Sequence, residues 1–189
     1  MKTLFIDTHY KDIIIAIFDD NKLVSNIELK NVANTSVDVM PSIVKCLDDA
    51  NINIKEIKKV AVCVGPGSFT GVRLGVTIAK VLAYSLNIDI VSLTAFDIVS
   101  LNLSSPKYIA IKENNGMFIS YFDGIDNKDI KYLKNSEFDQ FKTNKDIAYE
   151  DEINYERLIE FINTLSVLNV HNVNPLYVKT IEALNDKKN

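Results

Sequence analysis

The sequence has few of the residues that usually carry metal or disulfide chemistry, with 2 cysteines, 2 histidines and no tryptophan in 189 residues. Cys46 and Cys63 form neither a C-x-x-C motif nor a disulfide framework, which fits a reducing compartment. His9 and His171 lie far apart, so they lack the spacing of two zinc ligands on one helix. Neither cysteine has a histidine near it in the sequence that could activate it. We therefore expect no metal site in this chain.

Long apolar runs are also missing. Asp7 interrupts the opening apolar run too early for the core of a signal peptide, and the run at 13–18 is far shorter than the roughly 18 residues that suggest a membrane span. A net charge of −4 lacks the broad positive field that draws proteins to phosphate backbones. We expect a soluble cytoplasmic protein without membrane contact, which reaches any nucleic acid through another subunit.

The composition is otherwise that of a globular protein, with 47% hydrophobic and 24% charged residues. Apolar segments at 2–6, 13–18 and 23–29, joined by short turns, predict an antiparallel meander. Beyond them the pattern predicts helices at 36–50 and 70–86 and strands at 59–64 and 89–91. Pro41 lies inside the first helix, so a kink or a delayed start is expected there. The order predicts an α/β fold with a mixed sheet flanked by helices.

The sequence Ser104-Ser105-Pro106 is the best boundary signal in the chain. We therefore expect 1–103 to form the main subdomain and 104–189 a shortened second one. In the second part, strands are expected at 108–111 and 117–122 around an Asn-Asn-Gly turn, and weaker helices at 136–141 and 155–168. The final Asn-Asp-Lys-Lys-Asn is expected to fray.

The strongest local signal is a glycine-rich segment that joins a predicted strand to a predicted helix. It reads Gly65-Pro66-Gly67-Ser68-Phe69-Thr70-Gly71-Val72-Arg73-Leu74-Gly75. Backbone amides at such a helix start can bind an anion. However, the segment lacks the lysine of a P-loop, and its glycine spacing is not that of the dinucleotide-binding fingerprint. The alternative is a tight turn whose glycines let the helix lie close to the sheet.

Both long predicted helices are richer in apolar residues than packing on one sheet requires. Small residues recur every four positions at Gly71, Gly75, Ala79 and Ala83, and such a stripe lets another backbone approach closely. Large exposed apolar patches usually mark partner sites. We therefore expect a partner interface made by Val37, Met40, Ile43, Val44, Leu47, Gly75, Ile78, Ala79 and Leu82. Packing beneath the chain's own sheet is the alternative.

Two polar residues follow the first predicted strand. Asp7 stands where actin-fold enzymes place a metal-associated carboxylate, but a lone aspartate at the end of a strand is more often a turn residue. We likewise expect His9 to be a surface loop residue rather than a ligand.

Several of these segments resemble the TsaB family, also called YeaZ. The segment from Gly65 to Gly75 is similar to that family's signature, and we single out Gly65, Pro66, Gly67, Ser68, Phe69, Thr70, Gly71 and Arg73 within it. Three further segments are similar to family elements: Leu4-Phe5-Ile6-Asp7-Thr8, Met40-Pro41-Ser42-Ile43 and Pro175-Leu176-Tyr177-Val178-Lys179. The resemblance is strong over about residues 1–100 and weak afterwards, except at the last element.

The resemblance implies an actin-like (ASKHA, ribonuclease H-like) fold with a reduced C-terminal subdomain. It also implies a subunit without catalytic residues that scaffolds and activates the catalytic relative TsaD, together with the ATPase TsaE. Their product is threonylcarbamoyladenosine next to the anticodon in tRNAs reading A-starting codons. ATP and metal are expected on TsaD and TsaE, and tRNA is expected to be reached only through the complex. Without TsaD, a homodimer through the same helices is expected.

Two departures bear on this expectation. TsaD has an H-x-x-x-H pair on its first long helix, whereas 35–41 contains no histidine here. The hairpin at 7–12, which contacts phosphates in actin-like kinases, contains no glycine. Two alternatives stay open. An actin-fold kinase or metal-dependent hydrolase acting alone predicts bound metal or tight ATP binding, and a stand-alone phosphate- or tRNA-binding module using 65–71 predicts salt-dependent RNA binding.

Overall fold

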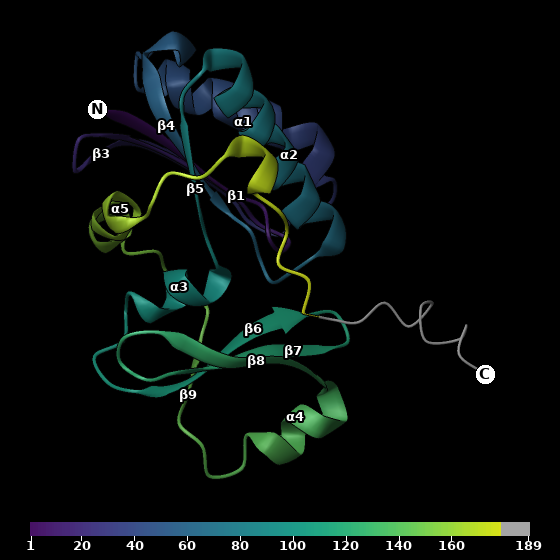
Figure 1. Ribbon diagram of the computed structural model, residues 1–189. Helices are drawn as coiled ribbons and strands as arrows, with labels where there is room; N and C mark the ends of the chain where they lie inside the picture. Colours follow the sequence, from purple (N-terminus) through teal and green to yellow (C-terminus); the bar gives the residue numbers. More distant parts are fainter. Residues whose placement is uncertain (179–189) are drawn as a thin grey trace.

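The computed structural model describes residues 1–178. It has two sheets that form two lobes, one above the other in the view of Figure 1. The first sheet has the order β3-β2-β1-β4-β5. Its strands are β1 (Lys2–Asp7), β2 (Ile13–Asp19), β3 (Lys22–Leu29), β4 (Ile57–Cys63) and β5 (Asp89–Leu93). The first three strands are antiparallel neighbours, and β4 runs parallel to both β1 and β5. The predicted meander and mixed sheet are therefore confirmed.

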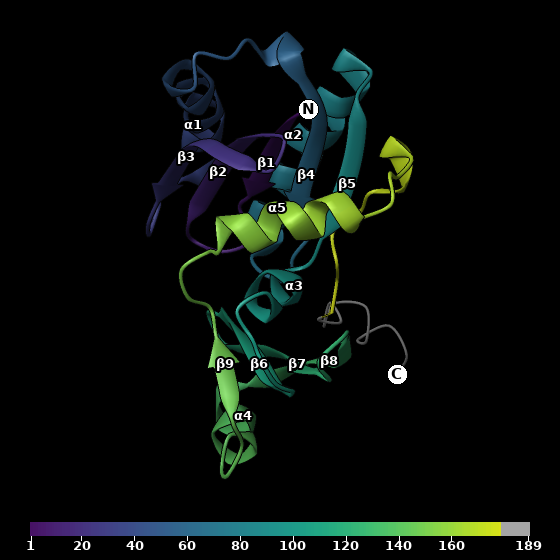
Figure 2. The same cartoon turned by 90° about the vertical axis from the view of Figure 1, so that its left-hand side faces the viewer.

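Alternate residues along the central strands supply a separate core to each face of this sheet, because successive side chains of a strand point to opposite faces. On one face, Leu4 and Ile6 of β1 pack with α1 (Thr35–Asp49) and α2 (Phe69–Leu86). On the other face, Phe5 of β1 packs with Leu158 and Ile159 of α5 (Tyr155–Thr164). Figure 2 shows α5 lying across the strands. The first sheet is thus covered on both faces.

The position of α5 corrects the predicted division of the chain at Leu103. Residues of α5 and of the 3-10 turn η2 (Val170–Asn172) belong with the first sheet, although both lie within 104–189. The physical reason is that Phe5, Phe18 and Val91 lie on the second face of the first sheet, where the apolar side of α5 buries them. The first lobe is therefore built from both parts of the described chain.

The second sheet forms a smaller lobe with the order β8-β7-β6-β9. Its strands are β6 (Lys107–Glu113), β7 (Gly116–Phe122), β8 (Asn127–Lys134) and β9 (Ile147–Tyr149). Ile109 and Ile111 of β6 face α3 (Ala95–Ser100), whereas Ala110 faces α4 (Asn135–Phe141). The lobe therefore has one short helix on each face of its sheet.

Several predicted boundaries differ from the structure. Pro41 does not delay α1, which begins at Thr35 and continues through the proline. The last predicted helix ends at Thr164 rather than at 168. Strands β8 and β9 and helix α3 were not predicted, nor was the 3-10 turn η1 (Ile54–Glu56). Lys179 and the terminal Asn-Asp-Lys-Lys-Asn lie outside the described residues.

Among residues 1–178, α2 is a helix with the length and hydropathy of a membrane span. One such helix is weak support for a span, because core helices of water-soluble proteins have the same length and composition. Its buried side, which includes Gly75, Val76 and Ala79, packs on the first sheet. We therefore interpret the buried side of α2 as a surface that packs on the chain's own sheet, which was the alternative explanation given for this helix.

Candidate functional site

The glycine-rich segment packs directly against the loop that follows β1. A Cβ atom at Gly67 would lie 2.0 Å from the carbonyl oxygen of His9, and one at Gly71 would lie 2.1 Å from that of Thr8. A Cβ atom at Gly75 would lie 2.5 Å from Oγ1 of Thr8. These distances leave no room for any side chain. The glycines therefore allow close packing of α2, which was the alternative explanation in the sequence analysis.

Hydrogen bonds fix the same contact. The hydroxyl of Thr8 donates to the carbonyl of Gly71 over 2.7 Å. The amide of Ser68 donates to the carbonyl of His9 over 2.5 Å, and the amide of Gly71 donates to the Ser68 hydroxyl over 3.3 Å. Two amides at the start of α2 thus already have partners within the chain. This arrangement disfavours the use of the segment as a phosphate-binding loop.

The late Pro175-Leu176-Tyr177 element lies against the glycine-rich segment. The amide of Leu176 donates to the carbonyl of Val64 over 2.8 Å. The ring of Tyr177 lies 5.8 Å from that of Phe69, and the Arg73 guanidinium lies 4.8 Å from the centre of the Phe69 ring. Two segments that the sequence analysis linked only by resemblance are therefore neighbours in the fold.

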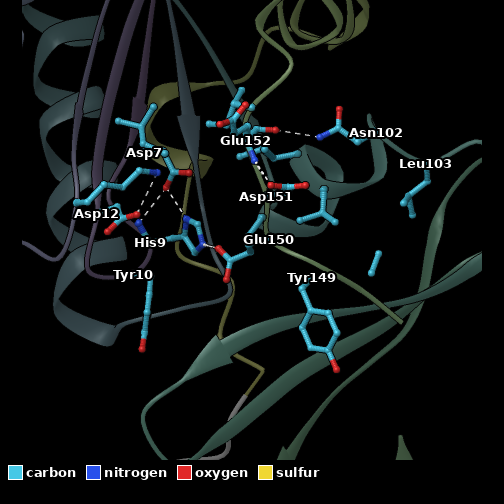
Figure 3. Close-up of a pocket in the computed structure, with 17 residues that line it drawn as sticks. Asp7, His9, Tyr10, Asp12, Asn102, Leu103, Tyr149, Glu150, Asp151 and Glu152 are labelled. Atoms are coloured by element: carbon cyan, nitrogen blue, oxygen red, sulfur yellow. Dashed lines mark hydrogen bonds and ion pairs between the residues drawn. The ribbon is translucent and has the colours of Figure 1, made fainter. Parts of the chain in front are cut away.

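Asp7, His9 and Glu150 form a hydrogen-bonded chain at the junction of the two lobes (Figure 3). Nδ1 of His9 lies 2.7 Å from Oδ1 of Asp7, and Nε2 of His9 lies 2.7 Å from Oε1 of Glu150. The backbone amide of His9 also donates to Asp7 over 2.9 Å. His9 is only 9% exposed. The prediction of a surface loop residue is wrong, because Glu150, distant in sequence, covers the ring.

The thiol of Cys63 completes this cluster. Cys63 ends β4, next to the end of β1, and is buried. The ligand atoms of Asp7, His9 and Cys63 all lie within 4.8 Å of one another. The sequence did not reveal the cluster because Cys63 lies far along the chain from Asp7 and His9. The only local signal was the Asp7-Thr8-His9 spacing at the end of a strand.

Burial and charge act in opposite directions on these groups. For His9, burial disfavours the charged ring, but the Asp7 carboxylate outweighs it and raises the pKa well above the usual value. For Asp7, burial would raise the pKa, but the charge and hydrogen bonds of His9 lower it overall. Burial, reinforced by Asp7, raises the pKa of the Cys63 thiol to about 12. Asp7 and His9 therefore form a buried ion pair, and Cys63 is a neutral thiol.

The cluster opens into a cleft of about 550 Å³ between the lobes. Among the described residues, the basic side chains of the cleft lining are His9 and Lys30. The carboxylates of that lining are five: Asp7, Asp12, Glu150, Asp151 and Glu152. Lys30 already pairs with Asp12 over 3.4 Å and with Glu28 over 3.5 Å. The negative field of this lining disfavours an unaccompanied triphosphate and favours a cation.

The predicted partner-interface residues divide into two groups. Val37, Met40 and Val44 are exposed on α1, and Ile78 and Leu82 are half-buried on α2. The other four, Ile43, Leu47, Gly75 and Ala79, are buried in the chain's own core. Their apolar character therefore needs no partner, and the small-residue stripe faces the sheet. Val81 and Tyr84, which the sequence analysis did not single out, are 59% and 72% exposed on α2.

Solved structures place this architecture among known folds. A structure titled "YeaZ from Pseudomonas aeruginosa" superposes with a TM-score of 0.73, covering 93% of this chain and 99% of that one at 13% sequence identity. At that identity the likeness shows the fold alone. The protein is an actin-like α/β protein.

Sequence comparison identifies the family. The family model described as "TsaD: tRNA N6-adenosine threonylcarbamoyltransferase" matches residues 24–170. The Bacillus subtilis "tRNA threonylcarbamoyladenosine biosynthesis protein TsaB" is 35% identical over 102 residues, which are 54% of this chain and 44% of that protein. The Escherichia coli protein of the same name is 30% identical over 94 residues, 50% of this chain and 40% of that one. The match thus spans less than half of each relative. The chain belongs to the TsaD family of proteins and, within it, to the TsaB (YeaZ) group.

Proposed function

We propose that this chain is a non-catalytic, cytoplasmic subunit in the biosynthesis of threonylcarbamoyladenosine in tRNA. It scaffolds TsaD in a heterodimer and works with TsaE. The modified base is the adenosine next to the anticodon in tRNAs that read A-starting codons. The observation that carries the proposal is the exposed apolar surface of α1 and α2, taken with the TsaB names of its relatives.

The contact surface is defined here as Val37, Met40 and Val44 of α1 with Ile78, Val81 and Leu82 of α2. The first three and Val81 are exposed, and Ile78 and Leu82 are half-buried against the core shared by the two helices. Exposed apolar side chains gathered on two neighbouring helices gain free energy when a partner removes them from water. TsaD is the partner we propose, and a second copy of this chain occupies the surface when TsaD is absent.

In this proposal the chain raises the activity of TsaD by shifting TsaD toward its competent conformational state. A partner that binds the competent state of TsaD more tightly than its other states raises activity without performing chemistry. ATP and the metal for the transfer reaction are placed on TsaD and TsaE in this proposal. Support comes from the acidic cleft and from the amides at the start of α2 that are already bonded within the chain. The net charge of −4 supports tRNA contact only through the complex.

The decisive experiment is co-purification with TsaD of the same organism, followed by tRNA modification with and without this chain. We expect a stable heterodimer and modification that depends on it. Met40→Lys should abolish the heterodimer because it places a charge in the contact surface. Lys45→Ala is the matched control, since Lys45 is exposed on the same helix outside that surface. Modification at full rate without the chain would refute the proposal.

An actin-fold enzyme acting alone is the second candidate. The observation in its favour is the position of buried Asp7, at the end of β1 and beside a cleft of about 550 Å³. It requires nucleotide turnover or tight ATP binding by the isolated chain. Incubation with ATP and Mg²⁺, followed by product analysis, separates the two candidates, because a scaffold leaves the nucleotide unchanged.

A further inference from the structure

We propose that Asp7, His9 and Cys63 form a zinc-type metal site at the base of the cleft. The ligands are a carboxylate oxygen of Asp7, Nδ1 of His9 and Sγ of Cys63, and Glu150 orients the histidine from the other lobe. These three residue types are among the usual protein ligands of zinc. The expectation of no metal site rested on the lack of histidines at helical spacing, and this cluster contains one histidine only.

The fold itself brings the ligands together. Strands β1 and β4 are parallel neighbours with Ile6 opposite Val62, so the next residues, Asp7 and Cys63, lie side by side at the same edge of the sheet. His9 follows Asp7 by two residues. The hydrogen bond that its backbone amide donates to the Asp7 carboxylate turns the loop back toward that edge. Three chemically different ligands therefore converge from two strand ends that are fixed in the core.

The distances suit a single ion. The three ligand atoms all lie within 4.8 Å of one another, and Nδ1 of His9 is 2.7 Å from Oδ1 of Asp7. Zinc bonds of about 2.0–2.3 Å place tetrahedral ligand atoms roughly 3.3–3.8 Å apart. Small side-chain rotations therefore reach the required geometry. The ion replaces two protons, one on Nδ1 of His9 and one on the Cys63 thiol.

Charge balance favours the ion. A divalent cation with one carboxylate and one thiolate is neutral, so the buried site carries no net charge that must be kept from water. In this site the thiol of Cys63 acts as a metal ligand, a role separate from the Asp7–His9–Glu150 hydrogen bonds. The acidic lining of the cleft, with Asp12, Asp151 and Glu152, attracts a cation toward the site.

Glu150 supplies the outer contact that histidine ligands of metals usually have. Its Oε1 lies 2.7 Å from Nε2 of His9, so Nε2 carries the proton and Nδ1 faces Asp7 and Cys63. Oε2 of the same carboxylate accepts a hydrogen bond from the amide of Lys112 over 3.3 Å, which ties it to β6 of the second lobe. The second lobe would thus support the metal site through Glu150.

The test is a cobalt titration of the full chain after treatment with a chelator. We expect one equivalent of Co²⁺ to bind and to produce a near-ultraviolet thiolate-to-cobalt charge-transfer band. Cys63→Ser should lose the band, and His9→Asn should bind at least about tenfold more weakly. Cys46→Ser is the matched control, because Cys46 is also buried but contacts Ser25 and lies outside the cluster. Glu150→Gln, which removes no ligand, should weaken binding by about 10- to 100-fold.

Two results would overturn the proposal. The first is wild-type protein that binds no cobalt or zinc, which would leave the cluster as an ion pair beside a buried thiol. The second is a charge-transfer band that survives in Cys63→Ser. If circular dichroism shows that Cys63→Ser does not fold, X-ray absorption of the zinc-loaded wild type decides. A sulfur neighbour at about 2.3 Å supports the site, and a shell of nitrogen and oxygen only refutes it.

Discussion

Thr8, in the loop that follows β1, lies against Gly75 of α2, with no space for a methyl group between them. The nearest atom to a Cβ placed on Gly75 is Oγ1 of Thr8, at 2.5 Å. The hydroxyl cannot simply turn away, because it donates to the carbonyl of Gly71 over 2.7 Å. Thr8, the residue immediately after the first strand, therefore limits how closely α2 approaches the sheet.

This contact predicts that Gly75→Ala destabilises the fold, by about 1–2 kcal/mol. Overpacking of a core typically costs about 1–3 kcal/mol, and the better helix propensity of alanine returns at most about 1 kcal/mol. In a Thr8→Ala background, the next contacts of the new Cβ are at 3.7 and 3.8 Å, which is ordinary packing. The same change should then be neutral or stabilising. Urea unfolding of the four proteins measures the coupling, and additive effects would contradict the prediction.

Helix α5 should contribute to the stability of the first sheet. Ile159 is fully buried against the second face of that sheet, so Ile159→Ala is expected to cost about 2–5 kcal/mol of unfolding free energy. Glu160→Ala is the control, because Glu160 is exposed on the same helix and should change stability by less than about 0.5 kcal/mol. Equal effects of the two changes on the free energy of unfolding would contradict a stabilising contribution from the packing of α5 on the sheet.

The chain without TsaD is expected to be a dimer at micromolar concentrations. Val44→Glu should convert it to a monomer, because Val44 is 52% exposed in the contact surface of α1 and α2. Since the side chain is not part of the core, the melting temperature of the monomer should be close to that of wild type apart from the lost dimer contacts. Sedimentation equilibrium gives the mass. Val167→Glu, at a residue that is 54% exposed outside the contact surface, is the control and should remain dimeric.

Alkaline pH should weaken the docking of α5 through Tyr155. Burial raises the pKa of this phenol, and its hydrogen bond to the Glu28 carboxylate, over 2.5 Å, raises it further. A pKa raised by folding gives stability that is complete below the unfolded value of about 10 and is lost as pH rises above it. The melting temperature should therefore fall more steeply above about pH 10 in wild type than in Tyr155→Phe. Parallel curves for the two proteins would contradict the assignment.

Much of the fold follows from the sequence because its signals are local. The β-rich apolar segment in β1 and the unbroken apolar run in β2 predict buried strands wherever they occur. The glycines at Gly67, Gly71 and Gly75 likewise predict a close approach of backbone, whatever the ligand. The resemblance to the TsaB family also rests on residues that can be read without coordinates. These features depend on neighbours along the chain, so the sequence by itself determined them.

The cluster at Asp7 depended on the tertiary structure. His9 looks like a solvent-exposed loop residue until Glu150, which lies beyond the second sheet, comes to cover it. Cys63 becomes its neighbour only because β4 pairs in parallel with β1. The division between core and contact surface on α1 and α2 was decided in the same way, since helical periodicity cannot tell which apolar stripe meets the chain's own sheet. Long-range pairing and burial, which no local pattern encodes, placed these groups.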